Sequence, residues 1–270
     1  TNRFAQAVVI GGASTTQAGA ETAGHMEVNG GTVLCEDYIT VGRGNGTAVT
    51  APDGLESTFT LNDGEVIIPS GKGVWLGAKL VDQTTLTAKP RLIINGGSLS
   101  ASLLYCGNGG GTARPKIEVN GGTMTLGPND AMRLSRAPGC ETEFTINGGT
   151  VCVTNQSLNL AEDIAGAKGT LNLNGGRLVA RTIYKDGLGT GEVNFNGGVF
   201  EPTQNGSAFT NLSANVLAGG AAFDVSADVT YTVAAPLAGV GGVTKTGAGV
   251  LVLSSSANTY AGETVVSGGV

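Results

Sequence analysis

Residues 92–101 read Leu92-Ile93-Ile94-Asn95-Gly96-Gly97-Ser98-Leu99-Ser100-Ala101, and the fold follows from this kind of stretch. Asn-Gly-Gly, or a close variant, occurs seven times between short runs of alternating apolar residues, at Asn29, Asn62, Asn95, Asn120, Asn147, Asn174 and Asn196. Consecutive asparagines are 33, 33, 25, 27, 27 and 22 residues apart. Self-similarity at this period is typical of one structural unit stacked many times.

Aligning the repeats on the asparagine gives a register of inward-facing positions. The residues three and one before it, and four and six after it, make 28 positions, of which 26 are Ala, Val, Ile, Leu, Met or Phe. The exceptions are Cys35 and Pro202, in a chain that is only 40% hydrophobic. The residue two before the asparagine is mostly polar. This period of two predicts a strand on each side of the asparagine, with the four apolar positions facing a common core.

The turn between the two strands is predicted from its composition. Gly adopts positive φ without a steric cost, and Asn tolerates it better than most residues. Asn62-Asp63-Gly64 is the variant, and it keeps the same turn chemistry. A hairpin meander is rejected because the pattern returns every 22 to 33 residues, whereas hairpins return every 8 to 12 or so.

A third short strand is predicted after each pair, at residues 39–41, 74–76, 103–105, 132–134, 158–160 and 181–183. Three short strands per repeat and one repeat per turn describe an all-β chain folded as a single-stranded parallel β-helix. We divide it into Asn-Gly-Gly coils over residues 1–202 and more diverged coils over 203–270, continuous with the first part. The chain is expected to begin and end within a coil, which leaves open strand edges and an open core.

The segments between the third strand and the next repeat vary most in length and carry much of the charge. Insertions on one face of a solenoid are often where it binds a ligand, which would make Arg114, Arg136 and Lys168 ligand-facing residues. The alternative is that these are solvated loops whose charge has no specific role.

The composition excludes several classes of function. The formal net charge is −6 without a basic stripe, which argues against nucleic acid as a partner. No run of apolar residues is long enough for a membrane span. No cofactor is predicted, and the single histidine, His25, excludes a site with several histidine ligands.

The four cysteines suggest a limited role for disulfides. In the register above, Cys35 points inward and Cys152 outward, and Cys35 is best explained as a small core residue. Cys106 and Cys140 fall on successive corner segments, where a disulfide would fit an oxidising compartment. Four cysteines allow three pairings, so this pairing is a hypothesis.

The end of the chain has a different pattern. It reads Val243-Thr244-Lys245-Thr246-Gly247-Ala248-Gly249, then Val250-Leu251-Val252-Leu253, and then Ala257-Asn258-Thr259-Tyr260. This region resembles the autotransporter-associated β-strand repeat, also called the passenger-associated transport repeat, and Lys245 matches the lysine of that family. The run Ser254-Ser255-Ser256 and Glu263 depart mildly from the family pattern.

The resemblance implies an extracellular, right-handed β-helix on the surface of, or secreted by, a Gram-negative or related bacterium. It implies a role in passenger secretion and folding, and no catalytic residues. The sequence therefore predicts a structural, non-catalytic scaffold of a surface protein or filament that associates end to end through its open coils. One alternative is an adhesin passenger that binds a host or surface glycan ligand through the corner loops.

A second alternative is a polysaccharide lyase or hydrolase, because many such enzymes use a β-helix. That chemistry needs acidic residues clustered with Arg or Lys on adjacent coils. Acidic pairs such as Glu162-Asp163 do not recur in register, and aromatic platforms are scarce, with one Trp and five Tyr. We therefore predict that the chain is not an enzyme.

Overall fold

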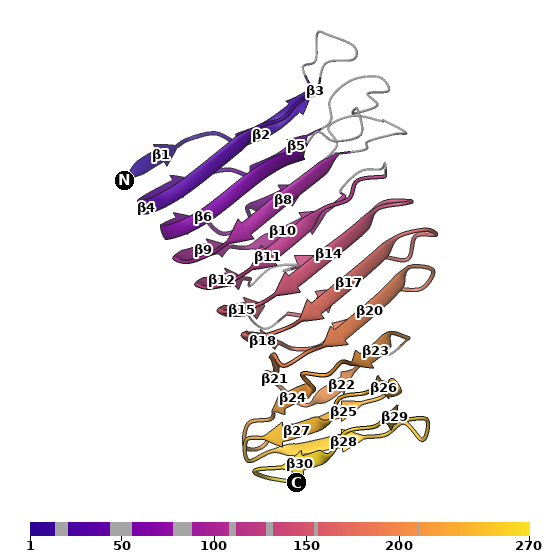
Figure 1. The fold of residues 1–270 in the computed structure, drawn as a ribbon. Helices are drawn as coiled ribbons and strands as arrows, with labels where there is room; N and C mark the ends of the chain where they lie inside the picture. The colour runs from indigo at the N-terminus through magenta and orange to yellow at the C-terminus, as the bar shows by residue number, and fades with distance from the viewer. Residues whose placement is uncertain are drawn as a thin grey trace.

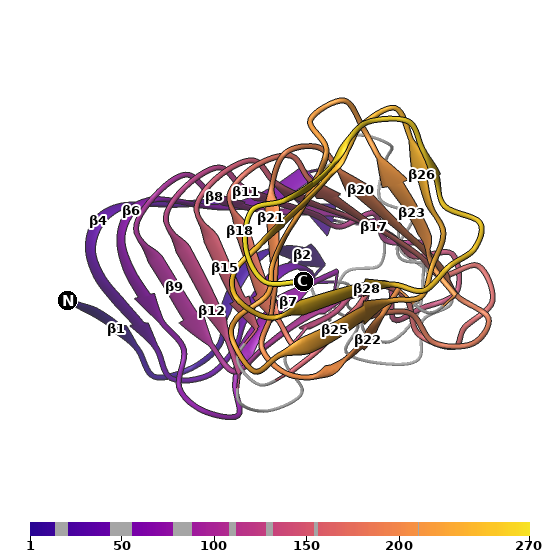
Figure 2. The same cartoon turned by 90° about the horizontal axis from the view of Figure 1, so that it is seen from below.

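The computed structural model describes residues 1–13, 21–43, 56–77, 88–107, 112–127, 132–153, 156–209 and 211–270. Every element in these ranges is a β-strand. Successive coils stack from the N-terminal to the C-terminal end of a parallel β-helix, as Figure 1 shows. Seen along the stack in Figure 2, the strands surround one interior. The predicted all-β solenoid is therefore confirmed.

Each coil supplies one strand before the Asn-Gly-Gly corner and one after it. In the first two repeats one strand runs through the corner, as β4 (His25–Cys35) and β6 (Glu56–Ile67). Before later corners lie β8 (Lys89–Ile94), β11 (Lys116–Val119), β14 (Glu141–Ile146), β17 (Lys168–Leu173), β20 (Thr190–Phe195), β23 (Ser213–Val216), β26 (Leu237–Gly239) and β29 (Thr259–Tyr260). After the corners lie β1 (Asn2–Phe4), β9 (Ser98–Ala101), β12 (Thr123–Leu126), β15 (Thr150–Val153), β18 (Arg177–Ala180), β21 (Val199–Pro202), β24 (Ala221–Asp224), β27 (Val243–Thr246) and β30 (Thr264–Val266).

The third strands form two further parallel stacks. One contains β2 (Val8–Ala13), β5 (Ile39–Arg43), β7 (Gly73–Leu76), β10 (Leu103–Cys106), β13 (Met132–Arg133), β16 (Leu158–Asn159) and β19 (Ile183–Tyr184). The other contains β22 (Gly206–Ala208), β25 (Thr230–Val233) and β28 (Val250–Leu253). One pairing is not parallel, because β3 (Glu21–Thr22) runs antiparallel to β2.

All six predicted third strands occur, with one displaced. The sixth was predicted at residues 181–183 and lies at Ile183–Tyr184, where Ile183 pairs with Leu158 of the coil above. Buried Ile183 sets this register, whereas Arg181 is exposed. Strand pairing crosses the predicted boundary at residue 202, since β20 pairs with β23 and β21 with β24.

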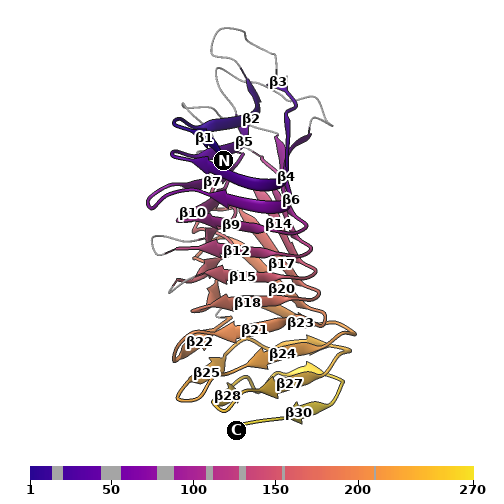
Figure 3. The ribbon, with the colours of Figure 1, turned by 90° about the vertical axis from the view of Figure 1, so that its left-hand side faces the viewer.

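The core is built from columns of apolar side chains, one from each coil. Of the 28 inward positions predicted, Met26 is half-buried and the other 27 are buried, including Cys35 and Pro202. Cys152 is only partly buried, as expected for an outward position. Figure 3 shows the strands that follow the corner aligned above one another. In their column Met124 pairs with Leu99 and Val151 in register, so side chains of one kind stack on each other.

Aromatic residues gather where the repeat diverges. Phe195, Phe200, Phe209 and Phe223 are fully buried and contact one another, with ring centroids 5.4 to 6.4 Å apart. Edge-to-face and tilted contacts of this kind add to the stabilisation from burial. This cluster fills the core across the boundary between the two parts of the chain.

Candidate functional site

The asparagines of the corner are joined by their side chains. Each Nδ2 donates to the Oδ1 of the asparagine one coil earlier, at 2.7 Å from Asn62 to Asn29 and 2.8 Å from Asn95 to Asn62. The bonds continue from Asn120 and Asn147 at 2.8 Å and end with Asn174 at 2.9 Å. We call these six residues the asparagine ladder. An amide both donates and accepts, so a column of amides can repeat one bond at every coil.

The ladder corrects the reason given above for asparagine at this position. None of the ladder asparagines has positive φ, so the residue is not needed for its backbone freedom. What each coil requires is a short carboxamide that reaches its neighbour above and below. The turn conformation is supplied by the second glycine, which has φ near 70° at Gly97, Gly122 and Gly149.

The first glycine of the corner is required for a different reason. A Cβ added at Gly96, Gly121 or Gly148 would lie 2.5 Å from the carbonyl oxygen of the asparagine one coil earlier. These glycines have no positive φ, so the restriction comes from the close approach of two backbones. In Asn-Gly-Gly the asparagine therefore supplies a hydrogen-bonding side chain, the first glycine allows the close approach of the adjacent coil, and the second glycine supplies the turn.

Asn196 has the same sequence motif but leaves the ladder. Its Oδ1 accepts a bond from the backbone N–H of Gly219 at 3.0 Å, and it makes no bond to Asn174. In this corner the first glycine, Gly197, has positive φ, and the second, Gly198, donates to Leu173 O. In the preceding corner the corresponding bond, to Ile146 O, is donated by the first glycine, Gly175. The turn is shifted by one residue, so Asn196 does not occupy the same place in its corner as the ladder asparagines do in theirs.

The outer surface of the main sheet carries charged side chains paired between coils. Arg91 on β8 bonds Glu56 at 2.8 Å and Glu118 at 2.6 Å, and these bonds raise its pKa above the ordinary value. Arg177 on β18 bridges Glu201 and Asp224, which lie on the next two coils. The bond from Arg177 holds the pKa of Asp224 below its ordinary value. Pairs of this exposure contribute little stability singly, but they fix neighbouring coils in register.

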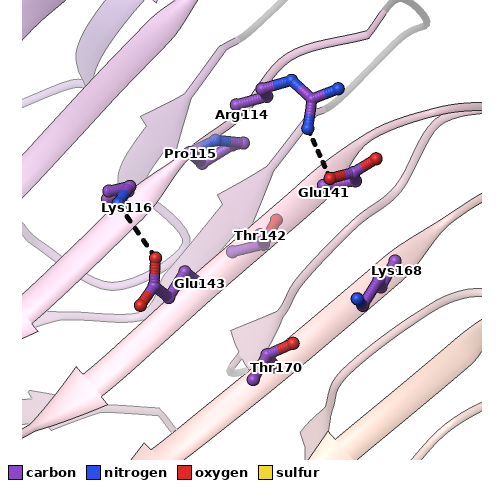
Figure 4. A pocket seen from close by; sticks show the side chains of 8 residues that line it. All are labelled: Arg114, Pro115, Lys116, Glu141, Thr142, Glu143, Lys168 and Thr170. Carbon is purple, nitrogen blue, oxygen red and sulfur yellow. Dashed lines mark hydrogen bonds and ion pairs between the residues drawn. The ribbon is translucent and has the colours of Figure 1, made fainter.

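A hollow of about 250 Å³ lies on this surface across β11, β14 and β17. Figure 4 shows its lining, with Arg114 directed at Glu141 and Lys116 at Glu143. The Lys116–Glu143 distance is 3.0 Å. Lys168 enters the same hollow, and it forms no ion pair with any residue that the structure describes. The hollow is thus a polar surface in which the ammonium group of Lys168 has no ion-pair partner among the described residues.

The structure brings together two of the three cations predicted to face a ligand. Arg114 and Lys168 share the hollow, whereas Arg136 does not line it. The Arg136 guanidinium bonds Glu162 at 2.7 Å and lies over the ring of Tyr105, 4.1 Å from its centroid. An arginine held by a carboxylate and an aromatic face is engaged within the protein. Of the corner segments predicted from the sequence, residues 44–55, 78–87 and 108–111 lie outside the described residues.

Cys106 and Cys140, the two residues of the disulfide hypothesis, lie close together. No disulfide joins any of the cysteines within the residues that the structure describes. Burial raises the pKa of Cys140 to about 11 and that of Cys106 well above its ordinary value, with each thiol near the other and near Thr142. The thiols therefore stay protonated at neutral pH. The thiolate is the nucleophile of disulfide formation, so the raised pKa values disfavour oxidation of this pair.

Lys245 has a structural role that sequence reasoning did not assign. Its side chain is buried in the column that contains Phe223 and Val266. The ammonium group donates to the carbonyl oxygens of Thr246 and Gly247 at 2.8 Å and of Gly268 at 2.9 Å. A buried ammonium needs partners for its three donors, and here all three are present. Since Gly268 belongs to the next coil, Lys245 fastens two coils together.

No group of metal-binding side chains occurs within the ranges that the structure describes. In the same ranges, no helix has the length and apolar character needed to cross a membrane. His25, the single histidine of the chain, is exposed on β4.

The comparison with family models identifies the last coil. Residues 243–270 match the model described as Passenger-associated-transport-repeat, which confirms the resemblance drawn from Lys245 and its neighbours. This repeat occurs in passenger regions of autotransporters and is not known as a catalytic family. No curated protein and no solved structure matches the chain.

The close approach at the corner predicts an asymmetry between two glycine substitutions. Gly148→Ala places a Cβ against the Asn120 carbonyl and should lower the free energy of unfolding by about 1–3 kcal/mol. Gly206→Ala is the matched control, because its Cβ meets only Tyr231 Cε2 at 3.9 Å and its φ is not positive. The control should be neutral or stabilising by up to about 1 kcal/mol. Urea denaturation measures both, and equal midpoints would contradict the account.

Proposed function

We propose that this chain is a non-catalytic structural part of a bacterial surface or secreted protein, exported as an autotransporter-like passenger. The observation that carries the proposal is the passenger-associated repeat at residues 243–270, which is continuous with the upstream coils through β24 and β27. The repeat family is associated with secreted or surface-exposed bacterial proteins. A stack whose coils share one core can serve as an extended rod that displays its surface away from the cell.

The side-chain chemistry supports a structural role. On the outer surface of the main sheet, Arg91 and Arg177 are each bonded to two carboxylates from neighbouring coils. A general acid or base needs a group left available to a substrate, with a pKa near the working pH. The carboxylates bonded to these arginines are instead committed to holding coils in register.

The location of the protein tests the proposal directly. Antibodies raised against this chain should label intact source bacteria or detect the protein in the medium, and added protease should remove the label from whole cells. A cytosolic marker protein serves as the control for cell lysis. Recovery of the protein only in the cytosolic fraction would contradict export.

A second candidate function is ligand binding at the hollow, favoured by the unpaired ammonium of Lys168 beside Arg114. An acidic glycan suits this site, because a carboxylate can pair with Lys168 where the other cations are already engaged. Glycan-array binding should fall with Lys168→Glu and persist with Lys185→Glu, whose ammonium bonds Gly187 O outside the hollow. Absence of binding by the native chain, or equal losses in the two variants, would reject this function.

We further propose that copies of this chain associate end to end. Strand β30 pairs with β27, and Val265 and Val266 within β30 are 42% and 56% exposed. A strand edge with exposed apolar residues favours pairing with another chain, and we propose a second copy as the partner. Sedimentation velocity should show a larger average mass as the protein concentration rises, and less so for Val266→Lys. A monomer at every concentration would contradict self-association.

A further inference from the structure

The Asn-Gly sequence that builds the corner is also a reactive dipeptide. The backbone nitrogen of the glycine can attack Cγ of the asparagine carboxamide, which forms a succinimide and releases ammonia. Water then opens the ring to aspartate or isoaspartate, so the reaction needs no other reactant. The described part of the chain contains seven such dipeptides, at Asn29, Asn95, Asn120, Asn147, Asn174, Asn196 and Asn205.

The interior of the asparagine ladder restrains this reaction. At Asn95, Asn120 and Asn147 the carboxamide donates through Nδ2 to one neighbour and accepts at Oδ1 from the other, at 2.8 to 2.9 Å. The carboxamide must turn toward the glycine nitrogen for attack, which breaks both bonds. The attacking nitrogens do not separate the rungs from Asn196, since Gly121 donates to Ile94 O at 3.3 Å, Gly148 to Val119 O at 3.2 Å and Gly197 to Gly220 O at 2.9 Å. The comparison therefore rests on the bonds of the carboxamides.

Asn196 and Asn205 are held less tightly. Each accepts one bond at Oδ1, from Gly219 N at 3.0 Å and from Thr230 N at 2.7 Å respectively. Neither amide nitrogen, the group that leaves as ammonia, donates to any residue that the structure describes. The two end rungs of the ladder, Asn29 and Asn174, have a single ladder bond each and are left out of the comparison.

For Asn196, solvent exposure gives the opposite order, whereas Asn205 is exposed like the interior rungs. The interior rungs Asn95, Asn120 and Asn147 are exposed, whereas Asn196 is half-buried. If access of water controlled the reaction, the rungs would react before Asn196. If the hydrogen bonds of the carboxamide control it, Asn196 and Asn205 react first. The two explanations can therefore be separated in one molecule.

We propose that Asn196 and Asn205 are sites of spontaneous deamidation in the folded protein, and that the ladder protects Asn95, Asn120 and Asn147. The two reactive sites flank β21, and Asn205 directly precedes β22, where the third strands change from one stack to another. Isoaspartate adds a methylene group to the backbone, which disturbs the register of β20 and β21 in the coil that joins the two parts of the chain. Ageing of the protein thus begins at this junction.

Peptide mapping by mass spectrometry tests the proposal in the native chain. The protein is incubated in mildly alkaline buffer, folded or unfolded in guanidinium chloride, and each Asn-Gly peptide is followed for aspartate and isoaspartate. Breaking the second hydrogen bond costs about a factor of ten, so the interior rungs should react at least about tenfold more slowly than Asn196 and Asn205 in the folded protein. In the unfolded chain, the difference should disappear.

A variant that interrupts the ladder gives an independent measurement. Asn120→Ser removes the donor to Asn95 and the acceptor of Asn147, so deamidation at both should accelerate relative to Asn196 in the same sample. Asn215→Ser is the control, because Asn215 bonds Asn194 and Glu192 in a separate row. Interior rungs that react as fast as Asn196 in the folded native chain would overturn the proposal, and so would rates that follow exposure. The native measurement decides even if Asn120→Ser fails to fold.

Discussion

The close stacking of backbones at the Asn-Gly-Gly corner is the constraint on which the other features depend. A side chain on the first glycine would lie 2.5 Å from the carbonyl oxygen of the coil above, so the corner admits only a bare backbone. This approach sets the distance at which asparagine carboxamides bond between coils. Inside the helix, the same spacing places Met124 next to Leu99 and Val151 of the adjacent coils. On the outer surface, it places Arg91 within bonding distance of Glu56 and Glu118.

Where the corner changes, the rest of the coil changes with it. The turn at Asn196 is shifted by one residue, and the following coil has Leu217 in place of asparagine. The asparagine ladder ends before this corner, and the buried phenylalanine cluster lies beside it. Further on, Lys245 connects coils through three carbonyl bonds, within the repeat that matches the passenger family. Coils are therefore joined by asparagine side chains from Asn29 to Asn174 and by the ammonium group of Lys245 near the C-terminal end, around a continuous apolar core.

The sequence was sufficient to predict the fold and the inward register, because apolar residues at fixed offsets from Asn95 and its equivalents have to face one core. It could not reveal that Asn196 leaves the ladder, since that depends on which glycine adopts positive φ. It also grouped Arg136 with Arg114 and Lys168, although Glu162 and Tyr105 hold Arg136 elsewhere. The contacts of Arg136 join residues between the repeated strands, where the number of residues differs from coil to coil. The period of the repeat therefore does not predict these contacts.

Hydrogen exchange of the asparagine side-chain amides, followed by nuclear magnetic resonance, tests the central claim most directly. The account predicts slow exchange of the Nδ2 protons of Asn95, Asn120 and Asn147, although these residues are exposed, and fast exchange of the Nδ2 protons of Asn196. Fast exchange at all four residues would show that the coils are not held by an asparagine ladder, and would contradict the account.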